Sequence, residues 1–202
     1  MTQGPEASAR ILDAAEELFY REGARMVGVD AVVKKAGVNK MSLYRQFSSK
    51  DELLRQYLLR REDKFWSYVN ASLDSHPEDP RAAVESLFLN LSRRTGAPGY
   101  RGCPFVNVAA EYPDPAHFAR QSIARHKHEL LERLHALSAA VLARAGAPAD
   151  RAAGRSLQLA KSLAILIEGA YTASQTYSAK DALLEALPAA AGAMIDAALQ
   201  AA

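Results

Sequence analysis

Seven side chains within one short segment carry the groups with which proteins bind nucleic acid. They are Lys40, Met41, Ser42, Tyr44, Arg45, Gln46 and Lys50. Cationic side chains bind phosphates because they release the counterions that surround DNA, and hydroxyl and amide groups hydrogen-bond to phosphates or to the edges of bases. These residue types therefore indicate a surface for double-stranded DNA.

The positive charge of the chain is concentrated around these residues. From Gly28 to Lys50, five Lys and Arg residues stand against Asp30 alone, a net charge of +4, whereas the whole chain carries +2. The remainder of the chain is therefore close to −2. A solvated helical face would explain the charge alone, so the helix pattern has to decide whether the segment is a DNA-binding one.

Two short helices are expected to position the basic segment. Apolar residues at 29, 32, 33 and 36 share one helix face, and Gly37 ends that helix. Asn39 is a favourable N-cap for the next helix, in which Leu43 and Phe47 lie about one turn apart and are expected to face inward. This pairing predicts a helix-turn-helix motif at about 28–47, packed on a preceding helix.

Apolar residues recur at helical spacing along nearly the whole chain, and no alternating strand pattern is evident. The sequence therefore predicts an all-α fold of about nine helices. Ser49 and Glu52 form a capping box for the fourth helix, and an Asp-Pro pair is expected to open the fifth and the seventh. The expected helices span about 11–22, 29–36, 40–47, 49–75, 80–95, 105–111, 115–145, 149–178 and 181–201, the last with an interruption at Leu187-Pro188.

The composition shifts towards Ala and Leu beyond the fourth helix. We therefore expect one domain at 1–50, which contains the basic segment, and a second, helical domain at 51–202. The long fourth helix would join them as a rigid connection that can carry a mechanical signal.

The composition also narrows the function classes. The chain has 202 residues, 49% hydrophobic and 24% charged, with neither a membrane-length apolar run nor a secretory signal, which favours a cytoplasmic, nucleoid-associated protein without membrane contact. Cys103 is the single cysteine, so no internal disulfide can form and a redox role is disfavoured. No two of the five histidines are spaced i, i+4, and neither a metal nor another cofactor is expected.

Several segments resemble, in order and spacing, the N-terminal pattern of the TetR family of bacterial transcription regulators. They are 11–19 (ILDAAEELF), Gly23, 29–32 (VDAV), 36–38 (AGV), 43–47 (LYRQF) and 49–54 (SKDELL), and they cover about the first quarter of the chain. The resemblance implies a three-helix DNA-binding head and a helical body that dimerises and usually holds a small molecule, so that 1–50 would be the DNA-binding domain and 51–202 the ligand-binding and dimerisation domain. A ligand in the body could then change the spacing of the DNA-binding segments through the fourth helix.

The resemblance also implies individual roles. Lys40, Met41 and Ser42 would face the bases, and Tyr44 and Lys50 would contact phosphates. The chain departs from the family at Gly28, where Thr or Ser is common, and at Gln46, where His is frequent. These departures affect any detailed operator prediction.

For the body, the sequence gives candidates for a ligand site and for a dimer interface. A ligand pocket needs apolar walls with a few polar groups, and the candidate lining residues are Trp66, Phe88, Leu91, Phe105, Asn107, Glu111, Tyr112, Phe118, Glu168 and Tyr171. For the apolar members, plain core packing is the competing interpretation. The helices at 149–178 and 181–201 are expected to form the dimer interface through Leu157, Leu163, Ile167, Ala170, Ser174, Ala189, Ala193, Ile195 and Ala197.

The favoured function is therefore a homodimeric, ligand-responsive transcription regulator, more specifically a repressor that a small molecule releases from its operator. One alternative keeps the DNA-binding head but makes the body ligand-independent or partner-binding. Another is an all-helical enzyme, which the absence of a phosphate-binding glycine loop, a GxSxG elbow and an HExxH helix disfavours.

Overall fold

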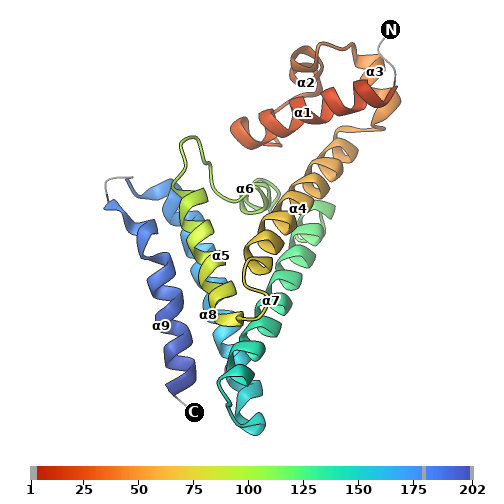
Figure 1. Ribbon diagram of the computed structural model, residues 1–202. Coiled ribbons are helices and arrows are strands. Elements are labelled where there is room, and N and C mark those ends of the chain that lie inside the picture. Colours follow the sequence, from red (N-terminus) through yellow and green to blue (C-terminus); the bar gives the residue numbers. More distant parts are fainter. Residues whose placement is uncertain (1–3, 179–180, 201–202) are drawn as a thin grey trace. The chain divides into compact units, whose positions relative to one another are not determined.

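The computed structural model describes residues 4–178 and 181–200, which form nine α-helices and one short 3-10 helix and contain no strand (Figure 1). The expected all-α class is confirmed. The outer ends of the two expected domains, residues 1–3 and 201–202, lie outside the described residues. The helices are α1 (Gly4–Glu22), α2 (Val29–Ala36), α3 (Lys40–Gln46), α4 (Lys50–Asp74), α5 (Pro80–Thr95), α6 (Pro104–Glu111), α7 (Phe118–Arg144), α8 (Ala149–Thr176), η2 (Leu183–Ala186) and α9 (Leu187–Gln200).

The backbone contacts divide the chain into two compact units. Unit 1 comprises residues 1–64 and 103–124, and unit 2 comprises residues 65–102 and 125–202. The continuous helices α4 and α7 each contain residues of both units. Unit 1 thus includes α6 and the start of α7 besides the N-terminal helices, which sequence analysis did not predict. The domain boundary expected at 50/51 stays a prediction.

In unit 1, α1, α2 and α3 contact one another pairwise around one small core. The apolar positions of α1 supply buried Ile11 and Phe19, on which Val32 of α2 and Leu43 of α3 converge as fully or nearly fully buried side chains. Gly23 ends α1 with a φ of +94°, a conformation that residues with a side chain rarely adopt.

In unit 2, α5, α8 and α9 pack against one another (Figure 1). Asp79 opens α5 as predicted, because its carboxylate accepts hydrogen bonds from the main-chain amides of Arg81 and Ala82, each at 3.1 Å. The side chain of Arg81 also pairs with Asp196 of α9 at 2.6 Å. The core residues of this unit include Phe88, Leu134, Leu163 and Ile195.

The start of α7 differs from the prediction. Asp114 does not open this helix: its carboxylate accepts the amide of Ala116 and its carbonyl that of His117, which closes a separate turn. The imidazole of His117 then accepts the amide of Ala119 at 3.2 Å, so α7 begins at Phe118. Towards the C-terminus, the interruption expected near Leu187-Pro188 takes the form of η2 followed by α9.

We expected no apolar segment of membrane length, and the length and composition of one segment contradict this expectation. The segment Leu183–Gln200 is long and apolar enough to cross a bilayer, although only 17% of it is buried within the chain. Its helix packs against α5 and α8, and α9 carries the charged Asp196. A packed helix with one open face accounts for the same pattern.

Four of the nine residues expected in the dimer interface are buried within the single chain, so they were predicted wrongly. Leu163, Ile167, Ala170 and Ile195 are 0–3% exposed within the chain, because they belong to the core of unit 2. The open face of α8 instead presents Ile165, which is 72% exposed and was missed. Leu157, at 38% exposed, lies on this open side as expected.

Candidate nucleic-acid interface

A side-chain cap starts α3. The Asn39 carboxamide oxygen accepts a hydrogen bond from the main-chain amide of Ser42 at 2.8 Å, as the sequence predicts. This bond satisfies one of the amides that every helix leaves open in its first turn. It also fixes where the first residues of α3 point.

The inward and outward faces of α3 are clearly separated. Leu43 is 0% and Phe47 4% exposed, so both anchor the helix in the core of unit 1. Met41 is 73% and Tyr44 48% exposed, and Arg45 is exposed beside them. Much of the surface of Met41 and Tyr44 is thus open to a partner on a basic helix.

Lys40 at the start of α3 is held near α2. Its ammonium lies 2.9 Å from the carboxylate of Asp30, and this hydrogen bond together with the negative charge raises the pKa of Lys40. Both side chains are largely exposed, so the pair contributes little to stability. The ammonium can exchange Asp30 for a phosphate without leaving a buried charge.

Lys50 at the start of α4 has a main-chain partner. Its ammonium donates a hydrogen bond to the carbonyl oxygen of Arg25 at 2.9 Å, and partial burial lowers its pKa. A phosphate contact for Lys50 stays a prediction. Ser42 and Gln46, the other predicted DNA contacts, are half-buried on α3.

The turn between α2 and α3 depends on a glycine. Gly37 has a φ of +63°, and a Cβ atom there would lie 2.7 Å from the guanidinium of Arg10. Arg10 uses this guanidinium to donate to the carbonyl oxygens of Ala36 at 2.5 Å and Gly37 at 3.2 Å. The side chain of Arg10, on α1, thus caps the C-terminal end of α2.

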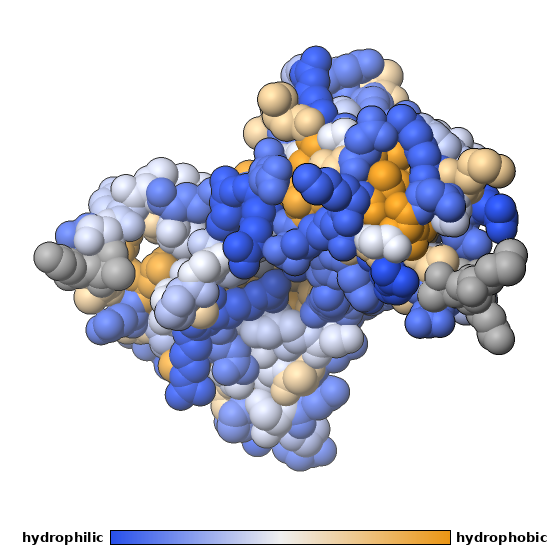
Figure 2. All heavy atoms as spheres, turned by 90° about the horizontal axis from the view of Figure 1, so that it is seen from above, coloured by the Kyte–Doolittle hydropathy of each residue, from blue (hydrophilic) through white to orange (hydrophobic). Residues whose placement is uncertain are grey.

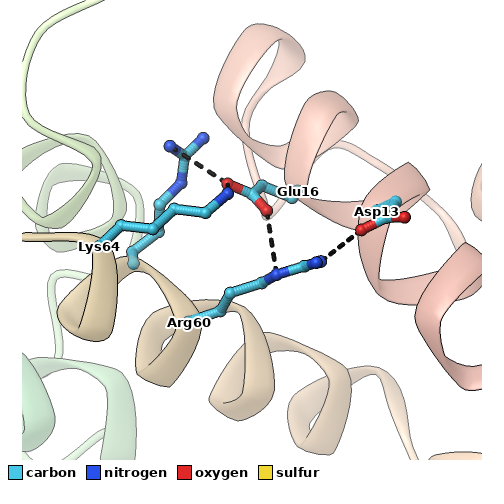
Figure 3. Close-up of polar contacts among 5 residues, drawn as sticks. Asp13, Glu16, Arg60 and Lys64 are labelled. Atoms are coloured by element: carbon cyan, nitrogen blue, oxygen red, sulfur yellow. Dashed lines mark hydrogen bonds and ion pairs between the residues drawn. The ribbon is translucent and has the colours of Figure 1, made fainter. Parts of the chain in front are cut away.

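A group of charges joins α1 to α4 within unit 1. Asp13 and Glu16 of α1 face Arg60 and Lys64 of α4 (Figure 3), and Arg61 of the same helix also reaches Glu16. The distances to Glu16 are 2.5 Å from Lys64, 3.3 Å from Arg61 and 3.4 Å from Arg60. Glu16 is only 12% exposed, so this carboxylate needs its cationic partners.

Sequence reasoning assigned no role to these supporting residues, although Asp13 and Glu16 lie within the matched segment 11–19. Arg10, Glu16 and Arg61 read as ordinary charges on amphipathic helices. Met26, in the loop before α2, was missed for a similar reason and is 83% exposed. An inward-facing charge on an otherwise apolar helix face was the only available signal.

The residues proposed to bind a ligand divide between the two units. In unit 1, Glu111 bonds to Arg25, Tyr112 stacks on His117 with ring centres 4.5 Å apart, and the guanidinium of Arg55 lies 3.9 Å from the ring centre of Phe118. Phe105 is buried and Asn107 half-buried.

In unit 2, two of the proposed ligand residues come together. Leu91 and Tyr171 line a small cavity of about 10 Å³ together with Phe65, Tyr68, Val69, Leu87, Leu130 and Ile167. Phe88 is fully buried in the core, and the carboxylate of Glu168 accepts a bond from Lys127 at 2.5 Å. Trp66 lies under the guanidinium of Arg133, 3.9 Å from its ring centre.

Two larger hollows in unit 2 were not predicted. One of about 580 Å³ is almost entirely apolar and lies between the C-terminal part of α8, η2 and the start of α9. The other, also about 580 Å³, is more polar and adds the end of α5 and residues 96–100. Both have the volume of a small-molecule site, and they share Ala173, Tyr177, Leu183 and Leu184.

Within the described part of the chain, no group of three or more His, Cys, Asp or Glu side chains is arranged to hold a metal ion. Cys103 is 2% exposed at the N-terminus of α6. His126 is buried against the rings of Phe65 and Trp66, and burial, aided by the charge of Lys127, lowers its pKa to about 4.

Two family models match the chain. Residues 11–57 match the model for bacterial regulatory proteins of the tetR family, and residues 80–188 match that for the C-terminal domain of LmrA/YxaF-like transcriptional regulators. The second match alone covers more than half of the chain. The first includes α2, α3 and the start of α4, which carry the interface described above.

Solved structures and curated relatives agree with these matches. A TetR-family transcriptional regulator from Streptomyces coelicolor superposes with a TM-score of 0.82 at 29% identity, covering 98% of this chain and 96% of that one. A second from Streptomyces avermitilis ma-4680 has a TM-score of 0.76 at 30% identity, covering 95% and 97%. The HTH-type transcriptional activator FasR of Mycolicibacterium smegmatis is 38% identical over 86 residues, 41% of this chain and 39% of that protein. The chain thus matches only about two fifths of the length of its first curated relatives.

Proposed function

The chain belongs to the TetR family of bacterial regulatory proteins, and we propose that it is a homodimeric transcription repressor that a small molecule releases from operator DNA. It would act in the bacterial cytoplasm, at the nucleoid. The observation that carries the proposal is the outward face of α3, where Lys40, Met41, Tyr44 and Arg45 are exposed on a helix anchored by two buried side chains.

The two kinds of DNA contact fall to different residues. Tyr44, Arg45 and Lys50 offer a hydroxyl and two cations to phosphates, which fix the register of α3 but carry no sequence information. Met41 and Ser42, near the N-terminus of α3, are placed to meet base edges in the major groove. The exposed thioether of Met41 is suited to an apolar contact with a thymine methyl group.

A second copy of the chain is proposed to cover the open faces of α8 and α9. Ile165 and Leu157 are exposed on α8, and Ala189, Ala193 and Ala197 are exposed on α9, where small side chains permit close approach. The apolar hollow beside η2 adjoins the same helices. Burying this surface in a dimer would remove the exposed apolar residues from water.

The effector is proposed to bind in the helical body and to act through α4. This helix is continuous from Lys50, which bonds next to the DNA-binding motif, to Val69, which lines the small cavity with Leu91 and Tyr171. An effector that enlarges this cavity would displace α4. Two recognition helices must fit major-groove sites about 34 Å apart, so a shift of a few ångström weakens binding.

The test has two stages. Purified protein is mixed with random genomic fragments, and the bound fragments are sequenced and footprinted. We expect a site with two half-sites related by a two-fold axis. Candidate effectors are then titrated with and without operator, using the fluorescence of Trp66, the single tryptophan of the chain.

Linkage fixes the expected result of the second stage. An effector that weakens operator binding by a given factor, about 5- to 150-fold for typical couplings, must itself bind the operator complex more weakly by the same factor. Equal effector affinity in both states would contradict the release mechanism. Enrichment of no sequence in the first stage would contradict operator binding itself.

A further inference from the structure

Glu111, the last residue of α6, is bonded to the loop that leads into the helix-turn-helix motif. Its carboxylate accepts a hydrogen bond from the main-chain amide of Arg25 at 2.5 Å. The guanidinium of Arg25 in turn donates to the main-chain carbonyl of Glu111 at 3.2 Å. Two bonds therefore join residues that lie 86 positions apart in the sequence, both within unit 1.

The backbone at Gly23 permits this close approach. A Cβ atom at Gly23 would lie 3.2 Å from both carboxylate oxygens of Glu111, and its φ of +94° also favours glycine. Between Gly23 and Gly28, Ala24 and Val27 are 0% and 4% exposed, so the loop is anchored in the core on either side of Arg25.

The main-chain carbonyl of Arg25 is bonded to a cationic side chain. The ammonium of Lys50 donates to the carbonyl oxygen of Arg25 at 2.9 Å, while the carboxylate of Glu111 accepts from its amide. The backbone of one residue thus lies between a negative and a positive side chain. The loop then runs directly to Gly28, the N-cap of α2, which has no side chain of its own to cap the helix.

We propose that Glu111 is a positioning residue for DNA binding: it fixes the 23–28 loop, and through it the start of α2 and the Lys50 ammonium, in the conformation that meets DNA. The role rests on the proposed DNA-binding function and goes beyond it, because α6 lies outside the helix-turn-helix motif. The carboxylate acts through the loop and does not itself touch DNA.

If the Glu111 carboxylate is removed, a positioning role and a purely electrostatic role predict opposite changes in DNA affinity. Removing a negative charge from a DNA-binding unit makes it more attractive to phosphates, which tightens binding. Losing the bond to Arg25 frees the loop, which weakens binding. The sign of the change therefore separates the two effects.

The experiment compares Glu111→Ala, Glu111→Gln and a control, Glu22→Ala, in the full-length protein. Glu22 is an exposed glutamate at the end of α1, next to the same loop. Operator and random DNA affinities are measured for each, together with hydrogen exchange of residues 23–28. Circular dichroism verifies that each variant is folded.

We expect Glu111→Ala to weaken operator binding by about tenfold, the effect of one lost hydrogen bond to a charged group. Random DNA should be affected less, and the exchange of residues 23–28 should become faster. Glu111→Gln, which keeps an acceptor oxygen, should recover part of the loss, and Glu22→Ala should bind as the wild type does or more tightly.

Unchanged or tighter operator binding by a folded Glu111→Ala would overturn the proposal, as would unchanged exchange of the loop. Equal losses on operator and random DNA would also overturn it, since positioning acts on the specific complex. If the wild type selects no DNA at all, the proposed function fails first, and the exchange data then report on the loop alone.

Discussion

The guanidinium of Arg61 lies 3.3 Å from the carboxylate of Glu16 and 4.6 Å from the ring centre of Tyr20. Arg61 belongs to α4 and its two partners to α1, and Arg61 and Glu16 are 17% and 12% exposed. The contact therefore joins the first helix of unit 1 to the middle of α4.

Replacing Glu16 by Ala should lower the free energy of unfolding by about 1–3 kcal/mol, because it leaves Arg61 partly buried without its carboxylate partner. Urea unfolding measures the change, with Glu22→Ala as an exposed control. A change within about 0.5 kcal/mol, as is typical of surface sites, would show that the cluster contributes no more than solvated charges.

Two glycines at the ends of α2 should respond differently to alanine. At Gly37 the added Cβ meets Arg10 at 2.7 Å and the φ is +63°, so Gly37→Ala should destabilise the protein by more than about 1 kcal/mol. At Gly28 the φ is −82° and the Cβ meets nothing within 4 Å, so Gly28→Ala should cost less. Thermal unfolding compares them, and equal losses would refute the strain argument.

The local structure of the DNA-binding motif could be predicted because each of its features depends on only a few neighbouring residues. Asn39 as N-cap, Gly37 as left-handed stop and Leu43 as inward anchor each depend on neighbours within one or two turns. The start of α7 was predicted wrongly because the local signal there was ambiguous. An Asp-Pro pair opens a helix or closes a turn equally well, and the imidazole of His117 decided between them.

Long-range contacts could not be predicted in this way. The bond from Glu111 to Arg25 depends on where the chain returns after 86 residues, and no periodicity contains this information. The buried and exposed faces of α8 were assigned wrongly for a related reason. This helix has apolar residues on both faces, so spacing alone could not distinguish buried Ile167 from exposed Ile165.

The stability of the protein should fall in mild acid because of His126. Burial lowers the pKa of this histidine from 6.5 to about 4, so between these values the unfolded chain binds a proton that the folded chain does not. The free energy of unfolding therefore keeps its full value, as far as His126 is concerned, above pH 6.5 and falls as the pH is lowered towards 4. The loss is at most about 1.4 kcal/mol per pH unit and about 2–3 kcal/mol in all.

Urea unfolding at several pH values tests this expectation against a His126→Phe variant. The variant should show a shallower loss of stability between pH 6.5 and 4, whatever its stability at pH 7. Parallel curves for the two proteins would mean that His126 does not titrate in this window.

A charge on the open face of α8 should separate the proposed dimer. Ile165→Glu places a carboxylate at a site that is 72% exposed in one chain but would be buried between two, so a stable monomer is expected in sedimentation. Leu89→Glu, at a 40% exposed site on α5, is the control and should remain dimeric. Dimers of both variants would contradict this interface.

The central claim, that α3 reads DNA with its outward face, is tested most directly by the ratio of operator to random-DNA affinity in Met41→Ala. Met41 is 73% exposed and supports no core, so the variant should keep its stability. We predict that this ratio falls by about 5- to 100-fold, the effect of one lost base contact, while random-DNA affinity is unchanged. An unchanged ratio, or an equal loss on both DNAs, would contradict the assignment of α3 as the base-reading helix.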